Sequence, residues 1–414
     1  MADRAQRIQR TALIASSLSS FLTAFMGSSL NVALPRLGQD LGLDAVLLGW
    51  VQTVYLLAAA VFLVPFGRLA DIHGRKRVYL WGIVTFGTAT LLCGTATSAA
   101  MLLGFRVLQG LGSAMIFGTG VAIITSVYPP QRRGRALGIS IAAVYTGLSA
   151  GPFLGGLLTG QWGWRSIFFA SVPVTAAALA VVLRWLEGEW AEARGEPFDW
   201  RGSLLYGVAV VAMMYGLPRV PGAVGLGLVA LGLVGLAAFA WWESQVHSPV
   251  LEVRLFLHSR TFAFSSLAAL INYSATAAVA FLMSLYLQYI GGLSPQRAGL
   301  VLVVQPVVQA VFAPLAGRLS DRVEPQVVAS AGMGLTALGL LLLTFLGPTT
   351  PLAYVYVALA FLGLGFGFFS SPNTNAIMGS VERRYYGVAS AIVSTMRLLG
   401  QMLSMGIATL LLAL

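Results

Sequence analysis

The sequence predicts an all-α protein that crosses a membrane many times. Of its 414 residues 57% are hydrophobic and only 9% are charged, with a mean hydropathy of +0.83, which is too little charge to keep a soluble protein of this length hydrated. Apolar stretches long enough to span a bilayer alternate with short charged clusters. These stretches lack the alternating pattern of barrel strands, and lipid cannot satisfy exposed backbone polar groups, so we expect each to be a helix.

Thirteen apolar segments can be delimited between the charged clusters. The first is too long for a signal peptide and lacks a small-residue cleavage site, so we expect it to remain in the membrane. We predict membrane-spanning helices at residues 12–34, 46–66, 78–98, 100–127, 136–160, 166–186, 202–218, 222–242, 261–290, 297–316, 326–347, 351–378 and 387–413.

Lysine and arginine are distributed unevenly between alternate loops. The N-terminus and every second loop hold 19 of them, the opposite loops hold 4, and Arg106 and Arg397 fall inside predicted spans. Basic residues concentrate on the cytoplasmic side of membrane proteins, so we expect a multi-pass protein of a prokaryotic cell (inner) membrane with a cytoplasmic N-terminus. The net charge of +11 comes mainly from these flanking clusters, which indicates a lipid bilayer as the partner and no nucleic acid.

One five-residue sequence occurs twice. Gly67–Asp71 reads GRLAD, and Gly317–Asp321, 250 positions later, reads GRLSD. Each copy closes one apolar segment just before the next begins. Two related halves within a membrane are typical of transporters.

The repeat divides the chain into three parts. We assign residues 1–186 to a first half of six helices, 187–260 to a linker with two inserted helices, and 261–414 to a second half. The second half has five helices, because the counterpart of the sixth span would begin where the sequence stops. We therefore expect a natural 6+2+6 architecture whose last helix this chain lacks. A longer gene product would support this, and a verified stop codon after Leu414 would contradict it.

Three motifs extend the pattern beyond the repeated pentad. Residues 67–77 read GRLADIHGRKR, residues 103–112 read LGFRVLQGLG, and residues 147–156 read GLSAGPFLGG. They resemble, in turn, the cytoplasmic loop signature of the major facilitator superfamily and two motifs of its fourteen-helix drug:proton antiporter branch, the multidrug efflux type. The resemblance covers the whole chain and implies the major facilitator fold, with two six-helix halves and two inserted helices.

The resemblance assigns gating or coupling roles to residues of these motifs. Asp71 can face a helix N-terminus or an arginine across the halves, and such a contact would hold the cytoplasmic side shut. The second copy keeps Asp321 but replaces the following Gly-Arg-Lys part with Val323–Pro325, so we expect a weaker contact there. The expected gating or coupling residues are Gly67, Arg68, Asp71, Gly74, Arg75, Lys76, Arg106, Gln109, Gly147, Gly151, Pro152, Gly155 and Asp321.

Each motif also has a simpler structural explanation. The loop motif could be ordinary positive flanking charge, although its repetition and its embedded aspartate argue against that. Arg106 could lie near the proton-coupling machinery or could be a structural arginine bonded to backbone carbonyls, and the sequence leaves both open. The glycines of residues 147–156 could serve close helix packing alone, or together with Pro152 they could form a moving interface.

The chain departs from the antiporter pattern in its acidic residues. Met26 stands where many members of the branch carry an acid, and no predicted span holds an acidic residue deep within it. A proton relay needs a titratable group within the membrane, and arginine does not release a proton in the working pH range. Protons are therefore expected as the coupling ion on the evidence of the motifs alone.

Polar residues within the predicted spans indicate a substrate site. Because buried acids are absent and Arg397 lies in the last span, the site suits a neutral or anionic amphiphile. For any single residue, an interhelical hydrogen bond is the alternative role. The expected substrate-binding residues are Asn31, Gln52, Tyr55, Tyr145, Asn272, Tyr273, Gln305, Gln309, Asn373, Asn375 and Arg397.

We therefore predict a secondary active transporter that exports small amphipathic compounds (multidrug efflux) by proton antiport through alternating access. The alternative is a flippase or exporter of a lipid or anionic amphiphile, not coupled through a buried carboxylate, because buried arginines could hold a phosphate. An enzyme is not expected, since Cys93 is the single cysteine and the three histidines lie in loops. We expect no catalytic residue, no metal, no cofactor and a monomer.

Overall fold

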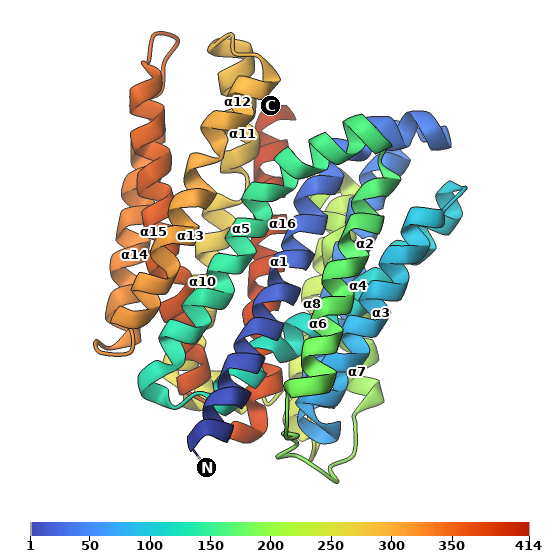
Figure 1. Cartoon of the computed structure of the whole chain (residues 1–414), viewed down its shortest axis with the longest axis vertical. Coiled ribbons are helices and arrows are strands. Elements are labelled where there is room, and N and C mark those ends of the chain that lie inside the picture. The colour runs from blue at the N-terminus through green and yellow to red at the C-terminus, as the bar shows by residue number, and fades with distance from the viewer. Residues whose placement is uncertain (1, 414) are drawn as a thin grey trace.

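The computed structural model describes residues 2–413, and 85% of the chain is helical (Figure 1). Short turns join the helices, and one longer extended segment runs from α6 to α7. The helices are α1 Ala2–Leu41, α2 Ala45–His73, α3 Arg75–Thr95, α4 Ala99–Val127, α5 Pro130–Trp162, α6 Arg165–Trp185, α7 Trp200–Gly216, η1 Leu217–Arg219, α8 Ala223–Gln245, α9 Arg254–His258, α10 Arg260–Thr276, α11 Val279–Leu285, η2 Tyr286–Ile290, α12 Pro295–Leu302, α13 Val304–Leu319, α14 Pro325–Leu343, α15 Leu352–Gly379, η3 Arg383–Tyr385 and α16 Tyr386–Ala413.

Twelve of the described helical segments are long and apolar enough to cross a membrane. They correspond to the predicted spans with one exception, the segment predicted at 202–218. That segment forms α7, which has 17 residues and is about 25 Å long at about 1.5 Å per residue, somewhat less than the apolar core of a bilayer of about 30 Å. The turn η1 continues α7 and leads into α8.

Three helices, α1, α2 and α5, extend beyond the predicted spans at both ends. Helix α1 covers Ala2–Leu41, compared with the predicted 12–34, because hydropathy marks only the apolar centre of a helix whose polar turns continue into water. Helix α2 runs on to His73, so the first pentad is helical and the chain turns only at Gly74, with a φ of 112°. Glycine adopts this conformation without the steric cost that a side chain would add.

The predicted span at 261–290 is not one continuous helix. It consists of α10, α11 and the π-helical turn η2. At the first interruption the backbone N–H of Ala278 donates to Ser404 Oγ of α16 at 2.9 Å, so a neighbouring side chain supplies a partner where the helix is broken.

The predicted span at 297–316 is also interrupted, at Val303 between α12 and α13. Pro306 explains the position of the break. It has no N–H to pair with the carbonyl of Leu302, and its ring would clash with that carbonyl in a regular helix.

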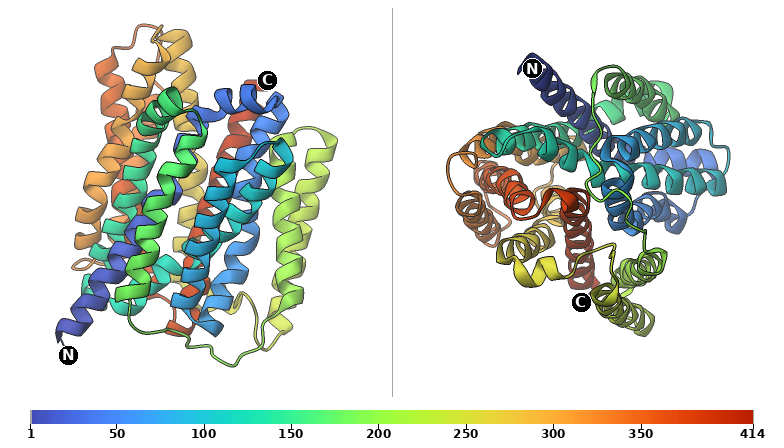
Figure 2. Two further views of the ribbon diagram at one scale, coloured as in Figure 1. Left: turned by 45° about the vertical axis from the view of Figure 1, so that its right-hand side comes forward. Right: turned by 90° about the horizontal axis from the view of Figure 1, so that it is seen from below.

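The long helices form two bundles with equivalent packing (Figures 1 and 2). In the first bundle α1 packs on α5, α3 on α4, and α2 on α4. In the second, α10 packs on α16, α14 on α15, and α13 on α15. The bundles meet through α2 against α16 and through α5 against α13. The α7–α8 pair lies outside both bundles, with α7 against α2 (Figure 2).

Glycines in equivalent positions bring the helices of each bundle close together. A Cβ atom added to Gly110 of α4 would lie 2.5 Å from the carbonyl oxygen of Tyr55 on α2, and one added to Gly363 of α15 would lie 2.7 Å from that of Gln305 on α13. Such contacts admit no side chain, and small residues give membrane helices their close packing. The internal repeat of the sequence is thus also a repeat of packing.

Candidate functional site

A cavity of about 1390 Å³ lies between the two bundles. Its wall comes chiefly from α1, α2, α4 and α5 of the first bundle and from α10, α13, α15 and α16 of the second. Eight of the eleven residues predicted to bind substrate line this cavity, namely Asn31, Gln52, Tyr55, Tyr145, Tyr273, Gln305, Gln309 and Arg397.

The other three predicted residues are buried away from the cavity. Asn373 Nδ2 donates to the carbonyl oxygen of Ser265 at 3.0 Å, and Asn375 Nδ2 donates to Ser320 Oγ at 3.2 Å. Asn272 is 3% exposed, and its Nδ2 has no hydrogen-bond partner among the described residues. For Asn373 and Asn375 the contacts are interhelical hydrogen bonds, the alternative role that the sequence had left open.

Arg397 is the one charged side chain among the lining residues, all of which the structure describes. Its guanidinium carbon lies 4.7 Å from the centre of the Phe117 ring. Within residues 2–413 no hydrogen bond or salt bridge joins the Arg397 side chain to another group. An anionic group that enters the cavity therefore meets a positive charge that the protein has not neutralised.

Two tyrosines place polar groups where the bundles approach each other. The hydroxyl of Tyr145 on α5 lies 2.6 Å from Ser370 Oγ on α15. The Tyr145 and Tyr273 rings both meet Phe366 edge-on, with ring centres 6.4 Å and 5.2 Å apart. The cavity wall thus combines aromatic surface with hydroxyl groups, the composition of a site for amphipathic molecules.

Sequence reasoning missed several lining residues. Gln401 lies one helical turn beyond Arg397 on the same face of α16, and this polar i, i+4 pair in an apolar helix is a signal that could have identified it. Serine and threonine hydroxyls carry no such signal, because many of them bond to the preceding helical turn, as Ser149 Oγ does to the carbonyl of Tyr145 at 2.9 Å. The missed hydroxyls include Ser16, Ser20, Thr23, Ser28, Ser140, Ser149, Thr276, Ser370, Thr374 and Ser394.

Arg106 lies behind the cavity wall and is fully buried. Its Nε donates to the carbonyl oxygen of Val51 at 2.9 Å, and its Nη1 and Nη2 donate to the side-chain oxygens of Gln109 and Gln52 at 2.5 and 3.1 Å. The guanidinium carbon is 4.3 Å from the centre of the Tyr55 ring. Arg106 is thus held by neutral acceptors, and it reaches the cavity only through Gln52 and Tyr55, which line it.

The end of the molecule at which α1 begins, here called the arginine-rich end, is closed by contacts between the bundles. Asp71 at the end of α2 accepts hydrogen bonds from the backbone N–H groups of Gly387 and Val388 at 2.8 and 3.1 Å. These groups belong to the first turn of α16, whose N–H groups have no partner within the helix. A carboxylate of one bundle therefore caps a helix of the other, where the helix dipole also favours negative charge.

Arg75 reinforces this cap. Its Nε and Nη2 donate to Asp71 Oδ1 at 2.9 and 2.7 Å, and both side chains are fully buried. The same guanidinium donates to Ser126 Oγ at 2.8 Å and to the carbonyl oxygen of Arg383 in the second bundle. It also pairs with Glu192 at 3.1 Å. Asp71 thus contacts a helix N-terminus across the bundles, whereas its arginine comes from its own bundle.

The acidic segment between α6 and α7 adds a second set of contacts. Glu196 pairs with Arg68 of the first bundle and with Arg384 of the second, the latter at 3.2 Å. Glu189 accepts from the backbone N–H groups of Lys76 and Arg77 at the start of α3, at 2.9 and 3.2 Å. Carboxylates of this segment therefore neutralise the first copy of the motif.

The second copy repeats the cap without the arginine. Asp321 accepts from the backbone N–H groups of Gly134 and Arg135 at 2.7 and 2.9 Å, in the first turns of α5. No salt bridge joins Asp321 to a cation among the described residues. Burial raises the pKa of the Asp321 carboxyl, although the two N–H donors and the nearby Arg133 oppose the shift.

Glycines allow both caps to form. A Cβ atom added to Gly67 would lie 2.6 Å from the carbonyl oxygen of Gly387. In the equivalent place, Gly317 of α13 lies against the carbonyl of Gly134 so closely that an added Cβ would overlap it. Only glycine permits backbones to approach in this way.

The glycine motif of α5 packs inside the first bundle. Added Cβ atoms on Gly151 and Gly155 would collide with Ser28 and Ser29 of α1, and Gly147 lies against α1 in the same way. Any movement that this glycine face permits is therefore between α1 and α5. Pro152 lines the cavity.

The cavity is closed at one end and extends to the other. No residue of the Asp71 or Asp321 contacts lines it, and Leu157 and Gly299, which do, lie near the ends of α5 and α12 that are distant from those contacts. A closed arginine-rich end and a cavity that reaches the opposite end are the features of one state of a two-state carrier.

Comparison with known proteins agrees with this architecture. The family model of the Major Facilitator Superfamily matches residues 16–405. The multidrug resistance protein Stp of Mycobacterium tuberculosis is 34% identical over 400 residues, which cover 95% of this chain and 74% of that protein. The tetracenomycin C resistance and export protein of Streptomyces glaucescens is 30% identical over 386 residues, 92% of this chain and 71% of that protein.

A solved structure supports the fold alone. The human organic anion transporter MFSD10 (TETRAN) matches with a TM-score of 0.68 over 98% of this chain and 93% of that chain, at 12% sequence identity. Together with the family match and the relatives, the two-bundle architecture identifies the chain as a multi-pass membrane transporter and not an enzyme. The chain belongs to the Major Facilitator Superfamily.

Proposed function

We propose that the protein exports small amphipathic compounds by alternating access, with its arginine-rich end in the cytoplasm. The observation that carries this proposal is the central cavity between two pseudo-equivalent bundles, closed at one end by a capping contact from each copy of the pentad. Because each contact links the first bundle to the second, breaking both contacts would open that end. The positive-inside distribution of lysine and arginine supports the orientation.

In this orientation the structure corresponds to the outward-facing state, from which an exporter releases its substrate. The gating residues are then Asp71, Arg75 and Asp321 with their backbone partners. Opening the cytoplasmic end would expose the first turns of α5 and α16 and leave both carboxylates in water. The cost of breaking these contacts has to be repaid by contacts that form at the opposite end or by the substrate.

The composition of the cavity favours neutral and anionic amphiphiles over cations. Arg397 is the one charge on a wall built mainly from aliphatic and aromatic residues, with Gln52, Gln305 and Gln309 as hydrogen-bonding groups. A cation would meet repulsion without a carboxylate to offset it. The names of the relatives, a multidrug resistance protein and a tetracenomycin C export protein, support export of such compounds.

Among the described residues, no carboxylate that could bind a proton during antiport lines the cavity. The acids whose surroundings change when the cytoplasmic end opens are Asp71 and Asp321, and we propose that their protonation is coupled to the opening of this end. Each is held by helix N-termini in the closed state and would be hydrated in the open state, so protonation and opening are linked.

A second candidate is a flippase for a lipid or another phosphate-bearing amphiphile. It is favoured by the Arg397 guanidinium, which lines the cavity with no hydrogen bond or salt bridge among the described residues, because arginine binds phosphate well. The two candidates differ in their coupling: an exporter driven by protons moves them in every cycle, whereas this flippase does not.

Purified protein in liposomes with an acidic interior and a trapped pH dye distinguishes the candidates. Matched cationic, neutral and anionic amphiphiles are added in turn. Proton efflux triggered by neutral and anionic compounds supports export by antiport, and lipid scrambling without proton movement supports the flippase. Arg397→Gln should weaken the response to anions selectively, whereas Arg297→Gln, an exposed arginine at the opposite end, serves as the control. Efflux with cations alone would contradict the proposed substrate class.

A further inference from the structure

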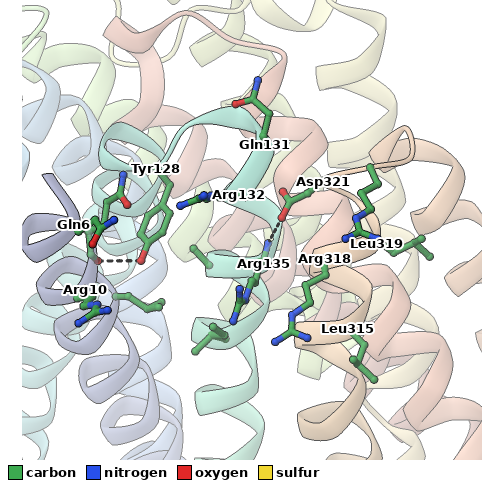
Figure 3. Close-up of a pocket in the computed structure, with 15 residues that line it drawn as sticks. Gln6, Arg10, Tyr128, Gln131, Arg132, Arg135, Leu315, Arg318, Leu319 and Asp321 are labelled. Carbon is green, nitrogen blue, oxygen red and sulfur yellow. Dashed lines mark hydrogen bonds between the residues drawn. The ribbon is translucent and has the colours of Figure 1, made fainter. Parts of the chain in front are cut away.

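A second pocket, of about 1090 Å³, lies at the arginine-rich end between α1, α5 and α13 (Figure 3). It is separate from the central cavity, with which it shares no lining residue. Five arginines converge on it from both bundles. Arg10 comes from α1, Arg132 and Arg135 from α5, Arg318 from α13, and Arg322 from the turn that follows α13.

None of the five guanidinium groups forms a salt bridge with an acid in the described part of the chain. None of these side chains takes part in a salt bridge or a hydrogen bond there. The single acid of the pocket is Asp321, whose oxygens accept from the backbone N–H groups of Gly134 and Arg135. The pocket therefore gathers an excess of positive charge at one place on this end, which attracts an anion.

Comparison with the first copy of the pentad indicates what this pocket lacks. Arg68 and Arg318 are the second residues of the two copies. Arg68 pairs with Glu196, which also pairs with Arg384 of the opposite bundle. No carboxylate of the described chain forms a salt bridge with Arg318. The acidic segment between α6 and α7 reaches α1 through Glu187, which pairs with Arg4 and with no arginine of the pocket.

The floor of the pocket is apolar. Below the arginines it is lined by Leu13, Ala136, Ile139 and Leu315, whereas Leu319 lies next to Arg318. The first four residues lie on the membrane side of the pocket, since each is nearer to the middle of its helix than the arginine of that helix. A ligand that satisfies both parts has an anionic head group at the level of the arginines and a hydrocarbon part beneath it.

We propose that this arginine pocket binds a phosphate-bearing anion, in the place that Glu196 occupies on the other side, and that an anionic phospholipid of the surrounding leaflet supplies it. Guanidinium groups bind phosphate in bidentate geometry. Because Arg10 and Arg132 belong to the first bundle and Arg318 to the second, the bound head group joins the two bundles at this end. It therefore stabilises the state in which this end is closed.

The test compares the intact protein with two variants of equal net charge. The pocket variant is Arg10→Gln/Arg132→Gln/Arg318→Gln, and the control is Arg77→Gln/Arg194→Gln/Arg201→Gln, whose arginines are exposed at the same end and outside the pocket. Binding of phosphatidylglycerol and cardiolipin to the delipidated protein is measured by native mass spectrometry, with phosphatidylcholine and inorganic pyrophosphate as further ligands.

The pocket variant should bind the anionic lipids roughly a hundredfold more weakly, as expected for three lost arginine contacts, and the control should bind them as the intact protein does. An equal loss in both variants would mean general attraction and overturn the proposal. If the intact protein binds pyrophosphate but none of the lipids, the ligand is a soluble anion, and the lipid assignment is overturned. Failure of the intact protein to bind any of these anions would overturn the site.

A further variant keeps the test decisive where the triple variant does not fold. Arg132→Glu places a carboxylate beside Arg135 and Arg318, which imitates Glu196 of the other copy. It should unfold at a higher temperature than the intact protein in the absence of lipid and should gain no stability from phosphatidylglycerol. A variant that still gains as much stability from lipid as the intact protein would show that the lipid binds elsewhere.

Discussion

The two copies of the pentad make the same contact between the bundles but support it differently. Asp71 and Asp321 each accept two backbone N–H groups from the first turns of a helix in the opposite bundle. Only the first copy, within the described residues, adds a buried arginine and an acidic segment to the cap. The contact that the repeat has kept is thus the backbone one, whereas the side-chain reinforcement is confined to one side.

The largest expected effect comes from removing each carboxylate in turn. Asp71→Asn leaves the buried Arg75 without its counter-charge, which costs about 3–5 kcal/mol. Asp321→Asn breaks no salt bridge among the described residues and keeps an oxygen that can accept from the two N–H groups, so it should change the stability of the closed state little. A cysteine at Ser20 in the cavity, with Cys93 replaced by alanine, reports opening through its reaction with a membrane-impermeant maleimide. Asp71→Asn should accelerate labelling from the arginine-rich end far more than Asp321→Asn. Equal acceleration would mean that the arginine adds nothing to the cap.

Alanine at the paired glycines tests what the copies share. Gly67→Ala would place a Cβ 2.6 Å from the carbonyl oxygen of Gly387, and Gly317→Ala would collide with the carbonyl of Gly134. Overpacking of this kind costs about 1–3 kcal/mol, so both variants should open the arginine-rich end to a similar degree in the same labelling assay. Gly104→Ala is the control, because its Cβ would meet nothing within 4 Å. A large effect at one glycine alone would show that the two backbone contacts are not equivalent.

A smaller effect is expected from removing the acidic reinforcement. Glu196 is 26% exposed while Arg68 is 1% exposed, so Glu196→Gln should cost more than an exposed pair and less than a buried one, about 1–2 kcal/mol. The variant makes the first copy resemble the second, with an arginine that lacks its carboxylate. Its thermal stability should therefore respond more strongly to phosphatidylglycerol than that of the intact protein.

The control for this comparison is Glu187→Gln, in the same segment, whose carboxylate pairs with the exposed Arg4. It should change neither the stability nor the response to lipid. A Glu196→Gln protein with an unchanged lipid response would argue that anions do not take the place of carboxylates at this end of the molecule.

Much of the fold followed from the sequence because membrane spans and repeats leave strong patterns. The apolar segments predicted the helices, and the repeated pentad marked where the bundles meet. The breaks at Ala278 and Val303 did not follow, since a hydropathy pattern is blind to whether an apolar segment is continuous. Pro306 offered a signal for the second break, while the first depends on Ser404 of a distant helix.

The site was harder to predict, for a physical reason. In a helix that is apolar on all sides, the sequence does not tell which face meets lipid, a neighbour or a cavity. Asn373 and Gln305 are therefore alike in sequence, although the first bonds to α10 and the second lines the cavity. Asp321 shows that a contact can also be kept where the surrounding motif has changed. The residues after Asp321 differ from those of the first copy, and a weaker contact was predicted for this reason. The two backbone hydrogen bonds of the cap nevertheless form, because they need only a carboxylate and two N–H groups.

The smallest expected effect is a pH dependence that belongs to the second copy. Burial raises the pKa of Asp321 when the arginine-rich end is closed, and in the open state this carboxyl would be hydrated and have its ordinary value of about 3.9. The closed state thus binds the proton more tightly. The protonated Asp321 carboxyl therefore stabilises the closed state. This stabilisation is fully present below the ordinary pKa and is lost as the pH rises through the raised pKa. Arg133 and Arg135 are the charged groups that face Asp321. Lowering the pH from neutrality should therefore slow maleimide labelling of the cavity cysteine, and Asp321→Asn should lose that part of the pH dependence while other acids keep theirs.

An unchanged pH profile in Asp321→Asn would show that this carboxylate keeps the same protonation in both states, and it would leave Asp71 as the remaining candidate for linking protons to the gate.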